Sequence, residues 1–392
     1  MSALFNEEHP IKRLQEAETL FTSGRFTEAA YRFRPLRYNR LVGNSARRRL
    51  AYVALISGNH YRAERQLRHL PREPESLKMS AALYRRSGQL ATAASCVRAL
   101  GSELMSHALR RLSEVPLTID APEIVRCPFS KLEPLPLLPV TIDGRETLFL
   151  LDTGSQEVVL DEKVVNQLEL WQSAPQNALY AGGRSAALRY SRVGQLKLGE
   201  ASFHNLPVQV QPLHATFKRM FDDVRVEGIL GTSLLSHFFT EADFAAGELR
   251  LSRPENAPRE NSHRFWLADA FLPLVRAGIN GRMTLPMLLD TGQQGFAAAL
   301  SVDAARAAKL PIADFPFTGE GGGGSVTVLP TRVESLQVAD SEIVSPPAVC
   351  MPRFGLEHRF GFRVGGMIGY EAVRGRCLSL DFRRMRLNVG EH

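Results

Sequence analysis

A long internal repeat constrains the fold of this chain more than any other feature of its sequence. The tripeptide Asp-Thr-Gly occurs twice, starting at Asp152 and at Asp290, and each copy follows an apolar run. Two further pairs recur at the same spacing of 138 positions. Gly228–Gly231 matches Gly366–Gly369, and Asp243 matches Asp381. A repeat of this length is too long for a solenoid, so it predicts two homologous lobes.

Short strands separated by Gly and Pro are expected in both lobes. Residues 140–142, the turn Asp143-Gly144 and the apolar run before Asp152 have the pattern of a hairpin. Short helices are expected at 161–170 and 302–310, and Asp243 and Asp381 are expected to shape turns. The predicted boundaries are 136–253 for the first lobe, 254–263 for an inter-lobe linker and 264–392 for the second lobe.

Residues 1–112 have the pattern of a helical domain. Apolar residues lie 5, 9 and 12 positions after each of Gly24, Gly58 and Gly88, which is the spacing of one helical face. This pattern resembles tetratricopeptide (TPR) repeats, which would imply a groove for a peptide or a partner protein. A helical domain that simply packs on the rest of the chain fits the pattern equally well. Prolines between 113 and 135 predict an extended linker.

Composition excludes several classes of protein. The chain has 392 residues, with 44% hydrophobic and 23% charged residues, as a soluble globular protein would have. The first residues show no basic stretch followed by an apolar one, so we expect a cytoplasmic protein without a signal peptide. No apolar run is long enough to suggest a membrane span. Residues 1–130 hold 21 Lys and Arg against 12 Asp and Glu. No base-stacking motif accompanies this charge, so binding of RNA ranks last among the hypotheses.

Two aspartates presented in this way can perform acid–base chemistry. Like charges held close together cannot both be ionised, so the pair shares one proton. One carboxylate can then activate a water while the other carboxyl group donates a proton, and aspartic proteases are the established example of this arrangement. Asp152 and Asp290 are therefore the predicted catalytic pair. No spacing of His, Cys or acidic residues suggests a metal or a cofactor.

Residues 136–390 resemble a single-chain, two-lobed aspartic protease of the retropepsin-like kind (clan AA). The resemblance rests on the two Asp-Thr-Gly loops and on the apolar-apolar-Gly motifs that end at Gly231 and Gly369. It implies two all-β lobes of the retropepsin- and pepsin-like acid protease fold after the helical domain.

The resemblance also implies roles for the residues around each aspartate. Thr153 and Thr291 would hydrogen-bond across the lobes, and Gly154 and Gly292 would allow the sharp turns. Gly231 and Gly369 would let an apolar strand pass beside each loop. Ser155 matches a residue that commonly hydrogen-bonds the outer carboxylate oxygen, whereas its counterpart Gln293 departs from the usual Ser, Thr or Ala.

Glycine-rich segments in each lobe are predicted to form flaps over a bound peptide. The first contains Tyr180, Ala181, Gly182 and Gly183, and the second contains Gly321, Gly322, Gly323 and Gly324. An ordinary flexible loop is the alternative for the second segment.

The leading hypothesis is an aspartic endopeptidase whose helical domain recruits or gates a protein substrate. The alternative is a catalytically silent, protease-like scaffold that binds peptides, and Gln293 is its main support. Both hypotheses imply a protein or peptide partner.

Overall fold

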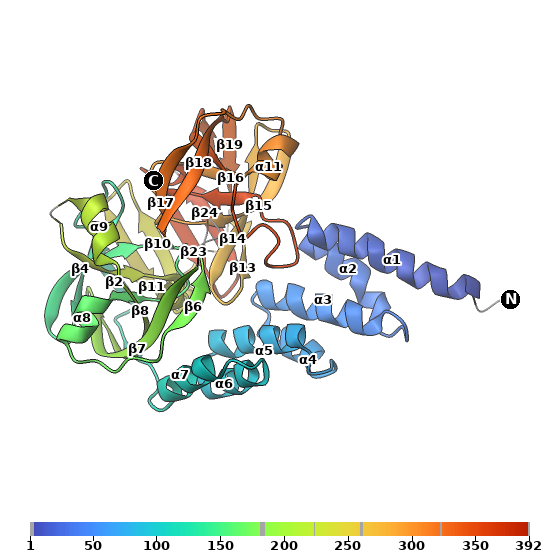
Figure 1. The fold of residues 1–392 in the computed structure, drawn as a ribbon, viewed down its shortest axis with the longest axis horizontal. Coiled ribbons are helices and arrows are strands. Elements are labelled where there is room, and N and C mark those ends of the chain that lie inside the picture. Colours follow the sequence, from blue (N-terminus) through green and yellow to red (C-terminus); the bar gives the residue numbers. More distant parts are fainter. Residues whose placement is uncertain (1–3, 181–184, 223, 259–261, 322–323, 391–392) are drawn as a thin grey trace.

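The computed structural model describes residues 4–180, 185–222, 224–258, 262–321 and 324–390. A row of helices is followed by two β-rich lobes, and the helices lie along one side of both (Figure 1). Among the described residues, no helix combines the length and the apolar character that a membrane crossing requires.

The helical region consists of paired antiparallel helices. Its helices are α1 (Leu4–Thr22), α2 (Phe26–Leu36), α3 (Gly43–Ile56), α4 (His60–Leu67), α5 (Pro74–Arg86), α6 (Leu90–Ala99) and α7 (Glu103–Ser113). Gly24, Gly58 and Gly88 lie between the helices of successive pairs with φ of 77°, 70° and 70°. This left-handed conformation ends a helix and suits glycine. The predicted helical hairpins are therefore present.

The helical region packs on the second lobe through aromatic side chains. The ring of Phe362 lies 5.9 Å from that of Phe21 and 4.8 Å from that of Phe26. Phe26 also contacts Trp266 at 5.2 Å. All four side chains are buried, so they form one core shared by α1, α2 and the lobe. The helical domain therefore packs on the rest of the chain, which was one of its two predicted roles.

The predicted linker at 113–135 is extended, but it is built into the β structure. It contains β1 (Thr118–Asp120), which pairs with β8 (Ala201–Gln211), and β2 (Ile124–Pro128), which pairs with β11 (Glu248–Ser252). Residues at alternate positions of β2 are buried. The segment therefore contributes strands to two sheets.

The first lobe is an eight-stranded sheet in the order β1-β8-β5-β9-β4-β3-β7-β6. Its remaining strands are β3 (Leu137–Ile142), β4 (Arg145–Leu151), β5 (Val159–Asp161), β6 (Gln176–Leu179), β7 (Ser185–Leu198), β8 (Ala201–Gln211) and β9 (Val226–Leu230). The predicted hairpin is β3–β4, with Asp143 and Gly144 at positive φ in its turn. The predicted helix at 161–170 is α8 (Glu162–Gln167), and α9 (His214–Phe221) and α10 (Thr232–Leu235) lie beyond the predicted elements.

The second lobe is a ten-stranded sheet in the order β17-β18-β21-β16-β22-β15-β14-β19-β20, with β13 paired to β14. Its strands are β13 (Trp266–Ala268), β14 (Leu272–Ile279), β15 (Met283–Leu289), β16 (Ala298–Ser301), β17 (Phe317–Gly321), β18 (Gly324–Arg332), β19 (Ser335–Val338), β20 (Ser341–Val344), β21 (Pro347–Met351) and β22 (Gly366–Ile368). The helix expected at 302–310 is α11 (Val302–Ala307), and a 3-10 turn, η2 (Tyr370–Ala372), follows β22.

A six-stranded sheet joins the lobes, in the order β12-β24-β23-β10-β11-β2. It contains β10 (Phe239–Asp243) and β11 (Glu248–Ser252) from the first lobe, and β12 (His263–Arg264), β23 (Cys377–Asp381) and β24 (Arg386–Gly390) from the second. A 3-10 turn, η1 (Pro254–Asn256), lies in the predicted inter-lobe linker, whose last residue begins β12. The repeated strands β10 and β23 are direct antiparallel neighbours, so the two halves of the repeat meet here.

Asp243 and Asp381 shape turns in this sheet, as predicted. The Asp243 carboxylate accepts hydrogen bonds from the N–H groups of Ala245 (3.1 Å) and Ala246 (2.8 Å). The Asp381 carboxylate accepts one from the N–H of Arg384 at 2.9 Å. Both side chains serve local backbone groups.

Candidate active site

Each Asp-Thr-Gly loop follows a strand that is hydrogen-bonded to a parallel neighbour. β4 runs parallel to β9, and β15 runs parallel to β22. The N–H of Asp152 donates to the Leu230 carbonyl (3.2 Å), and the N–H of Asp290 donates to the Ile368 carbonyl (2.8 Å). The two loops are therefore held by the same local structure, repeated once in each lobe.

The threonines lock the loops together in a reciprocal network. The Thr153 hydroxyl donates to the Leu289 carbonyl (2.8 Å) and accepts from the N–H of Thr291 (3.1 Å). The Thr291 hydroxyl donates to the Leu151 carbonyl (2.9 Å) and accepts from the N–H of Thr153 (3.0 Å). Both side chains are buried. Four buried hydrogen bonds therefore join the loops, as the resemblance implied.

The carboxyl groups of Asp152 and Asp290 meet at this junction. Each is packed against the glycine of the other loop. A methyl group added at Gly154 would lie 2.4 Å from Cγ of Asp290, and one at Gly292 would lie 2.4 Å from Cγ of Asp152. The two carboxyl groups are also hydrogen-bonded to each other. Only glycine leaves room for this approach at either position.

Gly231 and Gly369 allow the neighbouring strand to pass close behind each loop. A methyl group at Gly231 would lie 2.1 Å from the Glu157 carbonyl oxygen, and one at Gly369 would lie 2.1 Å from that of Phe296. Both backbones are extended, with φ of −91° and −90°, so the glycines serve close packing here. This is the role expected from the sequence.

The surroundings of the two carboxyl groups differ. Burial raises the pKa of both, and the adjacent Asp152 charge raises the pKa of Asp290 further. Asp152 accepts hydrogen bonds from the N–H groups of Gly154 (2.7 Å) and Ser155 (3.1 Å), whereas Asp290 accepts one from Gly292 (3.1 Å). The extra donor stabilises the charged form of Asp152. The surroundings therefore raise the pKa of Asp290 more than that of Asp152 and favour the shared proton on Asp290.

The residues after the two glycines differ from the implied pattern. The Ser155 hydroxyl donates to the Glu157 carbonyl (2.9 Å), and only the Ser155 backbone N–H reaches Asp152. Within the described part of the chain, the Gln293 backbone N–H donates to the Asp290 carbonyl (3.2 Å), whereas no hydrogen bond joins the Gln293 side chain to the Asp290 carboxyl group. Cγ of Gln293 lies near Gly369. Neither side chain therefore supports an outer carboxylate oxygen.

The predicted flaps correspond to two hairpins at equivalent places in the lobes. β6 and β7 form the first and β17 and β18 the second. Tyr180 follows β6, and burial raises the pKa of its hydroxyl to about 12. Gly321 and Gly324 are paired at the end of the second hairpin. The predicted flap residues Ala181, Gly182, Gly183, Gly322 and Gly323 lie outside the described residues.

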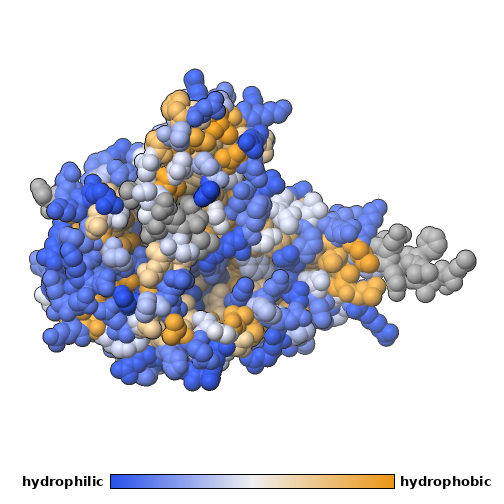
Figure 2. Space-filling view, viewed as in Figure 1, coloured by the Kyte–Doolittle hydropathy of each residue, from blue (hydrophilic) through white to orange (hydrophobic). Residues whose placement is uncertain are grey.

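Apolar side chains are exposed beside the second hairpin. Phe315 is 68% exposed and Phe317 is 41% exposed. The ring of Phe317 lies 6.2 Å from that of Phe296, which follows the Asp290 loop. Figure 2 shows that apolar side chains gather on the second lobe on this face of the molecule. The contact between Phe296 and Phe317 thus links the segment after the Asp290 loop to the second hairpin.

The Asp152 loop is also held by residues that no sequence motif indicated. Arg85 of α5 forms an ion pair with Glu157, and both side chains are less than one-fifth exposed. The Gln156 side-chain oxygen accepts from the N–H groups of Ala270 and Phe271, each at 3.1 Å. Arg85 and Glu157 are far apart in sequence and belong to no motif, so only the fold reveals this contact.

Arg86 extends the same connection to the second lobe. Its guanidinium donates to the carbonyl oxygens of Leu267 and Asp269, both at 2.7 Å, and also to that of Ala270. These carbonyls surround the turn between β13 and β14. The neighbouring residues Arg85 and Arg86 therefore connect α5 to both lobes.

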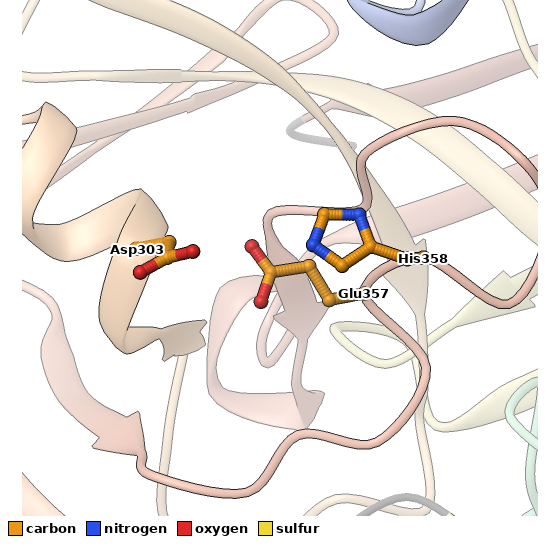
Figure 3. A group of neighbouring side chains, drawn as sticks. All are labelled: Asp303, Glu357 and His358. Carbon is orange, nitrogen blue, oxygen red and sulfur yellow. The ribbon is translucent and has the colours of Figure 1, made fainter.

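A second group of ligating side chains lies in the second lobe. Asp303, on α11, and Glu357 and His358, on a loop, each bring one ligand atom within 4.8 Å of the others (Figure 3). Asp303 and His358 are exposed, and Glu357 accepts a hydrogen bond from the Ser301 hydroxyl at 3.2 Å. Exposed groups of this kind are common without an ion, so geometry alone assigns no metal here.

Comparison with known proteins identifies the two lobes as relatives of one family. The aspartyl protease family matches residues 138–234 and 275–372. No curated protein shows a significant match to the chain. The two lobes are thus aspartic-protease-like in sequence and in fold.

Solved structures with low sequence identity resemble parts of the chain. Conglutin gamma, a basic 7S globulin from lupine seeds, is 11% identical, with a TM-score of 0.40 over 69% of this chain and 96% of its own. Soybean basic 7S globulin is 10% identical, with a TM-score of 0.38 over 70% and 95%. A retropepsin-like aspartic protease from Rickettsia conorii is 14% identical, with a TM-score of 0.23 over 36% and 96%.

Proposed function

We propose that this protein is an aspartic endopeptidase in which Asp152 and Asp290 hold the attacking water. The observation that carries the proposal is the contact between two carboxyl groups that share a proton, held by the buried threonine network. The family match to both lobes supports it.

The difference between the two aspartates suggests their roles. The Asp152 carboxylate takes a proton from water as the water oxygen attacks the peptide carbonyl carbon, and the Asp290 carboxyl group gives its proton to the carbonyl oxygen. When the C–N bond breaks, the proton on Asp152 passes to the leaving nitrogen, and the new carbonyl returns a proton to Asp290. One water is consumed, and the pair ends with a single proton, as it began.

An extended peptide is the proposed substrate. The hairpins β6–β7 and β17–β18 offer backbone groups with which an extended chain can pair. The exposed rings of Phe315 and Phe317 favour apolar substrate side chains on the side of the second lobe.

The helical region is proposed to gate access to the two aspartates as well as to recruit substrate through its TPR-like hairpins. Its helix α5 holds the first catalytic loop through Arg85 and Glu157. Its helix α7 packs through Ala108 and Leu112 against Leu188 and Tyr190, on the strand that follows the first hairpin tip. A movement of the helices would therefore affect both the loop and the hairpin.

Replacement of each aspartate tests the enzyme proposal. Asp152→Asn and Asp290→Asn should each abolish cleavage of a peptide library while the circular dichroism spectrum stays unchanged. Asp120→Asn, which changes an exposed aspartate of β1, is the matched control and should retain full activity. Full cleavage by either dyad variant would exclude the proposed mechanism.

A silent, peptide-binding scaffold is the second candidate. The absence of a hydrogen bond from the Gln293 side chain to Asp290, within the described residues, favours it. Wild-type protein that binds library peptides but leaves them uncut between pH 3 and 8 would support the scaffold. Recovery of cleavage in Gln293→Ser would assign the lost activity to this residue.

A further inference from the structure

A positively charged cavity lies between the helical region and the sheet that joins the lobes. Its volume is about 470 Å³. Helices α2, α3 and α4 form one wall, and β12 with the turn between β23 and β24 forms the other. Six arginines line this arginine cavity, whereas none of its described lining residues is acidic: Arg34, Arg37, Arg62, Arg65, Arg264 and Arg384.

Most of these arginines have no acidic partner among the described residues. Arg384 pairs with Asp381 at 2.9 Å. Four others are exposed and form no ion pair within the described ranges of the chain: Arg34, Arg62, Arg65 and Arg264. Elsewhere in the helical region arginines do have acidic partners, as in Arg25–Glu28, Arg48–Glu73 and Arg68–Glu64. The cavity therefore gathers around one space four arginines without an acidic partner in the described part of the chain, at Arg34, Arg62, Arg65 and Arg264.

The concentration of positive charge affects a neighbouring group. The pKa of the Tyr38 hydroxyl is lowered by a hydrogen bond from Arg37 and by the charges of Arg37, Arg47 and Arg65. Like charges placed together repel one another, and a bound anion would remove this repulsion. The cavity is therefore suited to a ligand with several negative charges.

The rest of the lining distinguishes between kinds of polyanion. Leu50, Val53 and Met385 lie among the arginines, and none of the described lining residues is aromatic. Single-stranded nucleic acid relies on aromatic rings for base stacking. Carboxylates match the planar arginine fork, and aliphatic side chains can contact the apolar residues.

We propose that the arginine cavity binds an acidic peptide segment of a protein partner, rich in Glu or Asp with interspersed aliphatic residues. The segment docks between the helices and the joining sheet. This inference deepens the proposed function, because such a segment would bring its protein to the proposed endopeptidase. Docking itself requires no catalysis, so the two proposals fail independently.

Binding is measured with the full chain carrying Asp290→Asn, so that the probe cannot be cut. The probe is a fluorescein-labelled 12-residue peptide of Glu and Leu. Matched probes are the same peptide with Lys in place of Glu and a 12-nucleotide oligouridylate. We expect saturable binding of the acidic peptide that weakens as salt rises, and no saturable binding of the Lys peptide.

Variants on both walls locate the site. Arg62→Gln/Arg65→Gln on α4 and Arg264→Gln on β12 should each weaken binding, the double variant at least tenfold. Arg68→Gln, at the end of α4 and paired with Glu64, is the matched control and should change binding less than twofold. Equal binding by all variants, no binding of the acidic peptide, or tighter binding of the oligouridylate would overturn the inference.

Discussion

Replacement of the Thr153 hydroxyl should destabilise the junction between the lobes by a predictable amount. Valine nearly preserves the shape of threonine but removes two buried hydrogen bonds, one to the Leu289 carbonyl and one from the N–H of Thr291. Each unpaired backbone group costs about 1–3 kcal/mol. Thr153→Val should therefore lower the free energy of unfolding by about 2–6 kcal/mol. Thr153→Ser keeps both bonds and loses one methyl group, so it should cost about 1 kcal/mol.

Urea unfolding followed by tryptophan fluorescence measures this difference. The chain has two tryptophans, Trp171 in the first lobe and Trp266 in the second, so both lobes contribute to the signal. Thr291→Val should behave like Thr153→Val, because its hydroxyl makes the two equivalent bonds. If both valine variants unfold within about 0.5 kcal/mol of the wild type, the threonine network does not hold the lobes together.

Three further outcomes follow from the site. The pKa of Asp290 in the folded protein is raised above its unfolded value of about 3.9. The contribution of protonated Asp290 to the stability of the fold is therefore complete below about pH 3.9 and is lost as the pH rises through the folded pKa. Asp290→Asn should therefore unfold at higher urea than the wild type at pH 7, and this advantage should disappear near pH 4. Gly231→Ala would place a methyl group 2.1 Å from a carbonyl oxygen, so it should lower the free energy of unfolding in urea by about 1–3 kcal/mol or more. Gly319→Ala is the control, because its methyl group would lie 3.9 Å from the nearest atom and should lower this free energy far less. Arg85→Met leaves the Glu157 charge without its partner, so this variant should reduce kcat more than it raises KM. The double variant Arg85→Met/Glu157→Gln should unfold at higher urea than Arg85→Met alone. Equal urea midpoints of the two variants would show that the pair is dispensable.

The sequence was sufficient to predict the two lobes and the meeting of Asp152 and Asp290. Both predictions rest on local chemistry repeated in the chain, namely an apolar strand, an aspartate and a glycine that permits a sharp turn. The helical hairpins were predictable for the same reason, since Gly24, Gly58 and Gly88 end helices through their own backbone freedom. The role of the segment 113–135 was predicted less well, because prolines indicate extended chain without indicating its pairing partner.

The sequence by itself determined which groups occur twice and therefore which two carboxyl groups had to face each other. Only the tertiary structure decided how they differ, because the number of N–H groups that reach each carboxylate depends on the path of the backbone around it. The contact of Arg85 with Glu157 was decided in the same way. A periodic sequence pattern shows which residues lie on the same helix or strand. A contact such as Arg85–Glu157, between residues that are not repeated, forms only when separate elements pack together.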